Sequence, residues 1–148
     1  MIDHSEKHRV LIVDDTPENI SMLIECLQDE YAIVVAKNGQ KALQLANAFP
    51  RPDIVLLDIM MPEMDGYEVC ASLKSDISTQ GIPIIFITGM SSEEDELKGL
   101  SLGAVDFITK PFNPYLVKQR VCNQLQLKHY QDRLELLVQE RTKDLEQA

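Results

Sequence analysis

Apolar residues along this chain fall into short continuous runs, and each run is followed by a segment with helical spacing. Residues 10–13 are apolar throughout and end at two aspartates, and residues 16–18, Thr-Pro-Glu, then supply a capping residue, a first-turn proline and an acid. Apolar positions next recur at i, i+3, i+4 and i+7, namely Ile20, Leu23, Ile24 and Leu27. Because such a stripe can cover one face of a sheet, the pattern predicts a strand followed by a helix.

The same unit repeats four more times. Further strands are predicted at residues 31–36, 54–57, 83–87 and 105–109. The helices after them are predicted to begin at Asn38-Gly39, at Gly66, at Ser91 or Ser92, and at Asn113-Pro114. The first of these helices has the apolar face Ala42, Leu45, Ala46 and Phe49. Strands that are apolar throughout are buried on both faces, as in a parallel sheet between two helical layers. The sequence therefore predicts a doubly wound α/β fold with five strands and five helices.

Composition and charge narrow the class of protein. The 148 residues suit one domain with an appendage, and 45% apolar with 26% charged residues is a globular mixture. The net charge of −10 repels nucleic-acid phosphates and anionic lipids, so we expect no direct nucleic-acid partner and no membrane partner. No apolar run has the length of a signal or membrane segment, and three widely spaced cysteines predict reduced, buried thiols. A cytoplasmic location is therefore expected.

The polar residues at the ends of the predicted strands indicate the chemistry. In an open parallel sheet the functional crevice lies at the carboxyl ends of the strands. The first, third, fourth and fifth strands place there Asp14 and Asp15, Asp58, Thr88 and Lys110. Taken singly, an aspartate after a strand is usually a helix cap, a Lys-Pro is usually a turn, and a threonine is usually a strand former. It is their joint placement that points to a functional site.

Three carboxylates held together repel one another unless a cation neutralises them, and Mg²⁺ suits oxygen ligands of this kind. A lysine and a threonine that face the same cation are suited to phosphate oxygens. The residues therefore predict Mg²⁺ as the cofactor and phosphoryl chemistry on a carboxylate. No glycine-rich loop of the dinucleotide-binding or P-loop kind follows the first strand, which disfavours a nucleotide-binding domain.

Four segments of the chain closely resemble the receiver domains of bacterial two-component response regulators. They are LIVDD at residues 11–15, LLDIMMPEMDG at 56–66, ITG at 87–89 and GAVDFITKP at 103–111. The resemblance covers about residues 8–125 and implies the flavodoxin-like strand order 2-1-3-4-5, with the last helix extended into a C-terminal linker. It also implies a phosphorylation-activated signalling switch, whose partners are a sensor histidine kinase or phosphotransfer protein and an output module.

The resemblance implies a role for each residue at the strand ends. Asp58 would accept a phosphoryl group from a phosphohistidine, and Lys110 and Thr88 would contact the phosphoryl oxygens. The residues that would bind Mg²⁺ are Asp14, Asp15, Asp58 and, through its backbone carbonyl, Met60. Phe107 would swing inward behind Thr88 and change the face formed by the fourth helix, the fifth strand and the fifth helix. Such a switch assists only its own phosphoryl transfer and autodephosphorylation, so it is not an enzyme that acts on an external substrate.

One other class of protein shares the same acyl-phosphate chemistry. A Mg²⁺-dependent phosphatase with an aspartyl nucleophile usually needs two aspartates separated by one residue, whereas Asp14 and Asp15 are adjacent. A flavodoxin-like cofactor carrier would need hydroxyl-rich phosphate loops and stacking aromatics, and the residues after the first strand offer neither. The regulatory switch is therefore the leading hypothesis, and the phosphatase is the alternative.

Some residues around the predicted site differ among receiver domains. Gly89 stands where the family more often has alanine, which would leave the loop that carries the hydroxyl looser. The Lys110-Pro111 bond is predicted to be cis, the isomer with which the family aims the lysine. Met60 and Met90 flank the entrance. Either they screen attacking water and lengthen the phosphorylated lifetime, or they only pack the rim.

The C-terminal residues differ in character from the rest. Residues 1–112 contain 8 basic and 19 acidic side chains, a charge of −11, whereas residues 113–148 contain 6 and 5, a charge of +1. A short apolar seam is formed by Leu127, Tyr130, Leu134 and Leu137. Either this segment is a solvated helix, or the chain forms a homodimer. The dimer would form through the tail or through the face of the fourth and fifth helices. We expect a receiver domain at residues 1–126 and a helical linker at 127–148, which resembles linkers to cyclic di-GMP phosphodiesterase, diguanylate cyclase or kinase modules.

Overall fold

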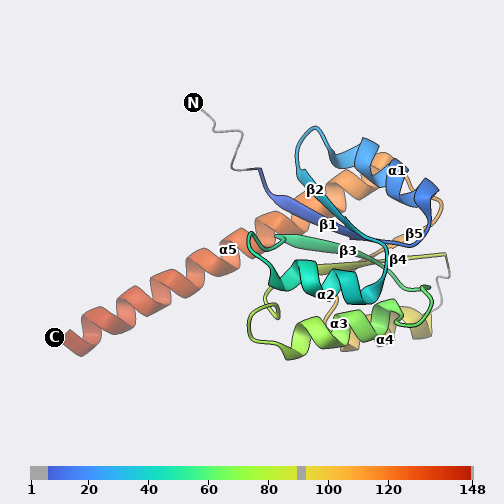
Figure 1. Cartoon of the computed structure of the whole chain (residues 1–148). Coiled ribbons are helices and arrows are strands. Elements are labelled where there is room, and N and C mark those ends of the chain that lie inside the picture. The colour runs from blue at the N-terminus through green and yellow to red at the C-terminus, as the bar shows by residue number, and fades with distance from the viewer. Residues whose placement is uncertain (1–6, 90–92, 148) are drawn as a thin grey trace.

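The computed structural model describes residues 7–89 and 93–147. Within these ranges five strands and five helices alternate without exception (Figure 1). The elements are β1 (Arg9–Val13), α1 (Pro17–Leu27), β2 (Ala32–Ala36), α2 (Gly39–Asn47), β3 (Ile54–Asp58), α3 (Gly66–Ser75), β4 (Ile84–Thr88), α4 (Glu93–Ser101), β5 (Asp106–Thr109) and α5 (Pro114–Gln147). The predicted alternation of strands and helices is confirmed.

All neighbouring strands of the sheet are parallel, in the order β2-β1-β3-β4-β5. In Figure 1, α1 and α5 lie on one side of this sheet, and α2, α3 and α4 lie on the other. Parallel neighbours require a crossover helix between them, and the two helical layers are these crossovers. The doubly wound, flavodoxin-like architecture expected from the sequence is therefore confirmed.

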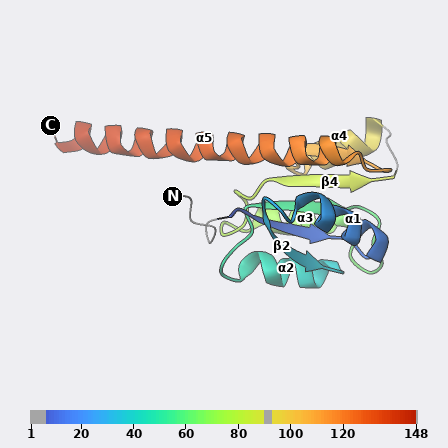
Figure 2. The ribbon, with the colours of Figure 1, turned by 90° about the horizontal axis from the view of Figure 1, so that it is seen from above.

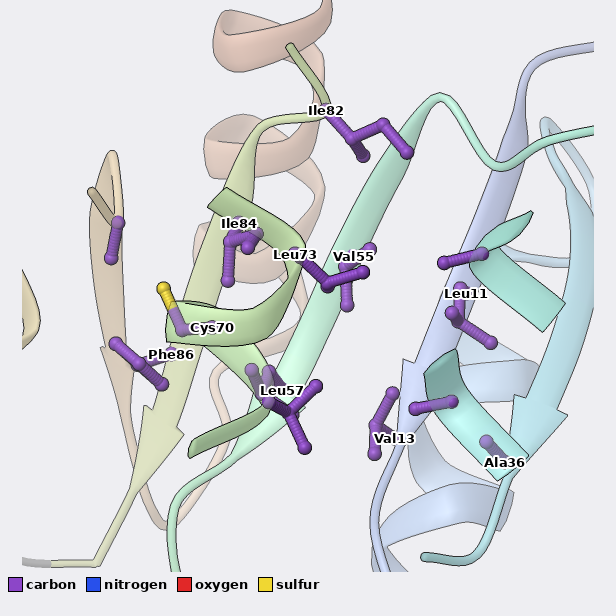
Figure 3. Packing of buried hydrophobic residues seen from close by; sticks show 14 of the residues in the cluster. Leu11, Val13, Ala36, Val55, Leu57, Cys70, Leu73, Ile82, Ile84 and Phe86 are labelled. Atoms are coloured by element: carbon purple, nitrogen blue, oxygen red, sulfur yellow. The ribbon is translucent and has the colours of Figure 1, made fainter. Parts of the chain in front are cut away.

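Two apolar clusters hold the layers to the sheet. Successive side chains of a strand point to opposite faces, so Val10 of β1 packs in the cluster toward α1 and α5, whereas Leu11 packs in the cluster toward α2 and α3. Figure 3 shows the second cluster, where Val55 and Leu57 of β3 lie against Leu73 of α3. This double burial explains why the central strands β1, β3 and β4 contain almost only apolar residues, whereas the edge strands β2 and β5 are mostly half-buried. It also leaves the strand ends as the place for polar chemistry.

One helix ends earlier than its apolar pattern predicts. Phe49 was expected on the buried face of the second helix, but α2 ends at Asn47 and the Phe49 side chain is 81% exposed. The physical reason is Pro50, because a proline disfavours the helical conformation of the residue before it. The guanidinium of Arg51 lies 4.3 Å from the centroid of the Phe49 ring instead. The predicted helix cap at Ser91 or Ser92 lies outside the described residues.

Two further sequence expectations concern single side chains. Thr16 is the N-cap residue of α1, as predicted, but its hydroxyl makes no capping hydrogen bond and donates to Oδ1 of Asp15 at 3.5 Å instead. The three cysteines are free, as expected, but only Cys70 is buried, whereas Cys26 and Cys122 are half-buried. Across residues 7–89 and 93–147, none of the helices combines the length and the apolar character that crossing a membrane requires.

The last helix, α5, has two distinct parts. Its first part packs on the sheet through the buried residues Val117, Val121 and Leu125. Its second part continues as a straight rod that projects away from the strands (Figures 1 and 2). The seam residues of this part are each more than half exposed: Leu127, Tyr130, Leu134 and Leu137. The expected extension of the fifth helix is thus present, and its apolar seam faces solvent.

Candidate functional site at the carboxyl edge of the sheet

Parallel strands bring the predicted site residues to one edge of the sheet. Asp14 directly follows β1, Asp58 and Thr88 are the last residues of β3 and β4, and Lys110 directly follows β5. One carboxylate oxygen from each of Asp14, Asp15 and Asp58 lies within 4.8 Å of the others. The sequence-predicted acidic cluster is therefore assembled by the fold.

Burial separates the three carboxylates. Asp14 is fully buried and Asp58 is 2% exposed, whereas Asp15 lies at the surface. Oδ1 of Asp14 accepts a hydrogen bond from the backbone N–H of Thr16 at 2.9 Å, which fixes the side chain at the start of α1. Oδ2 of Asp14 is buried, and no group in the described part of the chain donates a hydrogen bond to it. A buried carboxylate oxygen without a donor is costly unless a cation approaches it.

Lys110 is the cation that approaches this cluster from the protein. Its Nζ lies 3.3 Å from Oδ1 of Asp58 and 4.0 Å from Oδ2 of Asp14. Its backbone N–H donates to the carbonyl oxygen of Thr88 at 2.8 Å, so the end of β5 is tied to the end of β4. The Lys110–Pro111 peptide bond is cis, as the sequence predicted.

One lysine does not compensate for the buried negative charge. Burial, followed by the charge of Asp14, raises the pKa of Asp58 to about 6, although Lys110 and the backbone N–H of Met60 act in the opposite direction. Desolvation and a like charge both disfavour the ionised carboxyl, and a single ammonium group offsets only part of this. A further cation at this site would therefore stabilise the ionised form of Asp58.

The chemistry of the donor set fits Mg²⁺. The available ligands are carboxylate oxygens, which a small hard cation prefers, and the unsatisfied Oδ2 of Asp14 is among them. The exposure of Asp15 leaves one side of the cluster open to solvent, where water could supply further oxygen ligands. Met60 follows the site on the loop after β3, with a side chain that is 67% exposed. Met90, the other methionine predicted at the entrance, lies outside the described residues.

The two predicted relay residues lie on neighbouring strands. Thr88 is buried at the end of β4 and pairs in register with Thr109 of β5. Phe107 lies beside Phe86 in the same register, with ring centroids 5.7 Å apart. The Phe107 ring is only partly buried, because it lies at the sheet edge beneath α4.

Gly66 is a site residue whose role sequence reasoning missed. A β-carbon on Gly66 would lie 2.8 Å from the α-carbon of Ile59, directly beside Asp58. The backbone N–H of Gly66 donates to the carbonyl oxygen of Ile59 at 2.9 Å. The loop after β3 therefore folds back onto the strand end, and only glycine fits at the contact. The Asp65-Gly66 pair, a common turn signal, was the available indication.

The fold and the site define a doubly wound domain with an acidic, lysine-containing carboxyl edge. A family of known proteins matches most of the chain. The sequence profile of the family described as "Response regulator receiver domain" matches residues 10–122. The chain belongs to this family. Receiver domains serve two-component signalling, pair with histidine kinases, and are signalling switches rather than conventional enzymes.

Individual relatives agree with this assignment. The chain is 47% identical over 123 residues to a probable cyclic di-GMP phosphodiesterase of Vibrio cholerae, covering 83% of this chain and 28% of that protein. It is 44% identical over 114 residues to the response regulator PleD of Caulobacter vibrioides, covering 76% of this chain and 25% of that protein. The chain thus spans about a quarter of the length of these relatives.

Solved structures show the same fold. A putative response regulator from Chloroflexus aurantiacus superposes with a TM-score of 0.78 at 32% identity, covering 82% of this chain and 99% of that chain. The chemotaxis protein CheY4 of Vibrio cholerae superposes with a TM-score of 0.75 at 30% identity, covering 79% of this chain and 98% of that chain.

Proposed function

We propose that this chain is a phosphorylation-activated switch in which Asp58 accepts a phosphoryl group from a phosphohistidine of a sensor histidine kinase or phosphotransfer protein. The proposal rests on the burial of Asp58 and on the charged groups that surround its carboxylate. Its carboxylate is buried, lies 3.3 Å from the Lys110 ammonium group, and shares a 4.8 Å cluster with Asp14 and Asp15. An acceptor needs such a nucleophilic oxygen beside charges that stabilise the transferred group.

The transfer is a displacement at phosphorus. A carboxylate oxygen of Asp58 forms the new O–P bond while the P–N bond of the donor histidine breaks, and the bonding electron pair stays on the imidazole nitrogen. With a pKa of about 6, the Asp58 carboxyl is mainly ionised at neutral pH and can attack. Lys110 offsets the charge of the phosphoryl oxygens, and the Thr88 hydroxyl donates a hydrogen bond to one of them.

Mg²⁺ belongs to this proposal. Asp15 would hold it directly, Asp14 partly through water, and Asp58 and the Met60 carbonyl would complete the protein ligands. When bound, Mg²⁺ supplies positive charge that offsets the carboxylates and the phosphoryl oxygens. The residues that would hold the ion lie beside Lys110, so both would supply positive charge to the phosphoryl oxygens.

The signal would leave the site through Thr88 and Phe107. Once Thr88 binds a phosphoryl oxygen, it vacates space at the end of β4 that the Phe107 ring can enter from the neighbouring strand. This movement changes the face formed by α4, β5 and α5. The chain would thus act on itself only, through its own phosphoryl transfer and autodephosphorylation.

The long α5 suggests how an output module is reached. We propose a receiver domain at residues 1–126 and a helical linker at 127–148, which joins it to an output module of the phosphodiesterase, diguanylate cyclase or kinase kind. The coverage of only 28% of the phosphodiesterase of Vibrio cholerae supports a longer protein of this organisation. The exposed seam of the linker supports a homodimer.

Phosphoryl uptake tests the function directly. The wild-type chain is incubated with acetyl phosphate and Mg²⁺, and the intact mass is compared with that of Asp58→Ala. The matched control is Asp29→Ala, because Asp29 is an exposed aspartate at the end of α1 outside the site. We expect one phosphoryl adduct in the wild type and in the control, and none in Asp58→Ala. An adduct that persists in Asp58→Ala contradicts the assignment.

A further inference from the structure

The first residues of α3 connect the acceptor to α4. Gly66 packs against the backbone of Ile59, beside Asp58, and the next residue, Tyr67, turns away from the site toward α4. The Tyr67 hydroxyl donates to Oδ1 of Asp95 at 3.4 Å. The Tyr67 ring also lies under the ammonium group of Lys98, 4.3 Å from the ring centroid. One side chain thus contacts α4 at two positions one turn apart.

Most of α4 lies at the surface. Among its residues 94–101, whose exposure is described, Gly99 alone is buried. Gly99 rests on the aromatic rings of Phe86 and Phe107, where a β-carbon would lie 2.6 Å from Cζ of Phe107. A helix with so few buried residues has low local stability and can shift between positions.

The same face of α3 also contacts the residues that follow α4. After Tyr67, the Cys70 thiol donates to the carbonyl oxygen of Leu102 at 3.6 Å, and the aliphatic part of Lys74 packs beside Gly103. These two contacts hold the chain that follows α4. Tyr67 is therefore the member of this face that contacts α4 itself, at Asp95 and Lys98, and it is also the member nearest to Asp58 in the chain.

The hydroxyl of Tyr67 is protonated at neutral pH and can donate a hydrogen bond. Burial, followed by the charge of Asp95, raises the pKa of Tyr67, so the phenol stays protonated at neutral pH. The ring packs edge-on against Phe86, with centroids 5.4 Å apart. The edge contact restricts the ring and points the hydroxyl toward α4.

We propose that Tyr67 is a positioning residue, which couples the loop that carries Asp58 to the position of α4. This coupling rests on the proposed function of Asp58 and runs beside the route through Thr88 and Phe107. A change at Asp58 moves the backbone of Gly66, because the two are in contact, and Tyr67 passes that movement to Asp95 and Lys98. The inference concerns the Tyr67 hydroxyl, since the ring also belongs to the core.

Amide hydrogen exchange of α4 tests this coupling. The variant Tyr67→Phe keeps the ring and removes only the donor, and Asp95→Asn weakens the same bond from the other side. The matched control is Tyr115→Phe, which removes the hydroxyl of a tyrosine that is 83% exposed. We expect amide exchange within residues 93–101 to rise about threefold in both Tyr67→Phe and Asp95→Asn, as the loss of one hydrogen bond implies. The double variant should add little to either single change.

A second measurement repeats the exchange after phosphoryl uptake from acetyl phosphate. In the wild type, uptake should change exchange in α4, and in Tyr67→Phe the adduct should still form while the change in α4 falls by at least half. Unchanged exchange in unphosphorylated Tyr67→Phe overturns the proposal. An undiminished response of α4 to uptake also overturns it and leaves Tyr67 as a packing residue. If the wild type takes up no phosphoryl group, the proposed function is wrong, and exchange in the unphosphorylated variants alone decides whether Tyr67 holds α4.

Discussion

The ammonium group of Lys110 lies 3.3 Å from Oδ1 of Asp58, although the two residues are 52 positions apart in the chain. Each residue stands at the end of its own parallel strand, and β4 lies between these strands. The contact therefore spans one strand of the sheet. It places a positive charge beside the buried carboxylate on which the proposed chemistry depends.

Removing this charge should impair phosphoryl uptake. In Lys110→Ala the transferred phosphoryl group loses a charged donor, and loss of one such donor typically lowers a rate about a hundredfold. The measurement is the rate of adduct formation from acetyl phosphate, followed by intact mass. Lys37→Ala removes an exposed lysine and serves as the control. Equal rates in the two variants would show that Lys110 has no part in the transfer.

The raised pKa of Asp58 predicts a dependence of stability on pH. The folded chain binds the Asp58 proton up to about pH 6, whereas an unfolded aspartate loses it near its ordinary value of 3.8. Between these values the folded state holds more protons, so the contribution of Asp58 to stability falls as the pH rises through this window. Above pH 6 the ionised carboxyl costs the fold at most about 3 kcal/mol.

Asp58→Asn should therefore be more stable than the wild type at pH 7 when a chelator removes Mg²⁺. The difference should shrink at pH 4 to 5, and it should also shrink when Mg²⁺ is added, because a bound cation stabilises the ionised form. Urea denaturation followed by circular dichroism measures this. A difference that is independent of pH would show that the carboxyl is not electrostatically strained.

Two glycines near the site should respond differently to alanine. Gly66→Ala would place a β-carbon 2.8 Å from the backbone of Ile59, and overpacking against backbone costs about 2 kcal/mol or more. Gly89 has no atom within 4 Å of its added β-carbon among the described residues, so Gly89→Ala should stay within about 0.5 kcal/mol. Urea denaturation midpoints measure both. Equal midpoints would contradict the close approach at Gly66.

The fold was predictable because its signals are local. A strand buried on both faces must be apolar throughout, so the sequence around Val10 indicates burial of both sides of the strand. A helix that covers a sheet shows an apolar stripe with a helical period, so the sequence around Leu23 indicates which side of the helix is buried. The strand-end residues follow from this, since parallel strands carry Asp14 and Asp58 to the same edge. The end of α2 was missed because the apolar spacing of Phe49 outweighed Pro50 in the prediction.

Contacts between elements were not predictable in the same way. The bond between Tyr67 and Asp95 depends on how close two elements pack. The same holds for the hydrogen bonds that Nη1 of Arg120 donates to Oδ1 and Oδ2 of Asp106, at 3.1 and 3.0 Å. No spacing in the sequence encodes that distance. The electrostatic strain on Asp58 was likewise only a qualitative expectation, because its size depends on burial and on the position of Lys110.

Met60 should affect the lifetime of the phosphorylated state. Its side chain is 67% exposed two residues after Asp58, where an apolar group can exclude attacking water. In Met60→Asn we expect loss of the phosphoryl group to quicken roughly threefold, as water gains access. The time course of dephosphorylation measures it, with Met22→Asn on α1 as the control. An unchanged rate would show that Met60 only packs the rim.

The projecting end of α5 should make the chain a dimer. The buried stripe Val117, Val121 and Leu125 and the seam Leu127, Tyr130, Leu134 and Leu137 lie on opposite sides of the helix at its regular turn. The domain therefore cannot cover the seam, which runs along residues 127–137 for about 15 Å. A second copy of the same helix is the simplest cover.

Sedimentation velocity can separate this seam from the rest of the helix. Leu134→Glu places a charge in the seam and should convert a dimer to a monomer, as should removal of residues 128–148. Gln139→Glu adds the same side chain on the opposite face of α5 and should leave the dimer intact. A chain that is already a monomer, or a dimer that survives both changes, would contradict association through the tail. In the second case the face formed by α4, β5 and α5 would be the remaining route to a dimer.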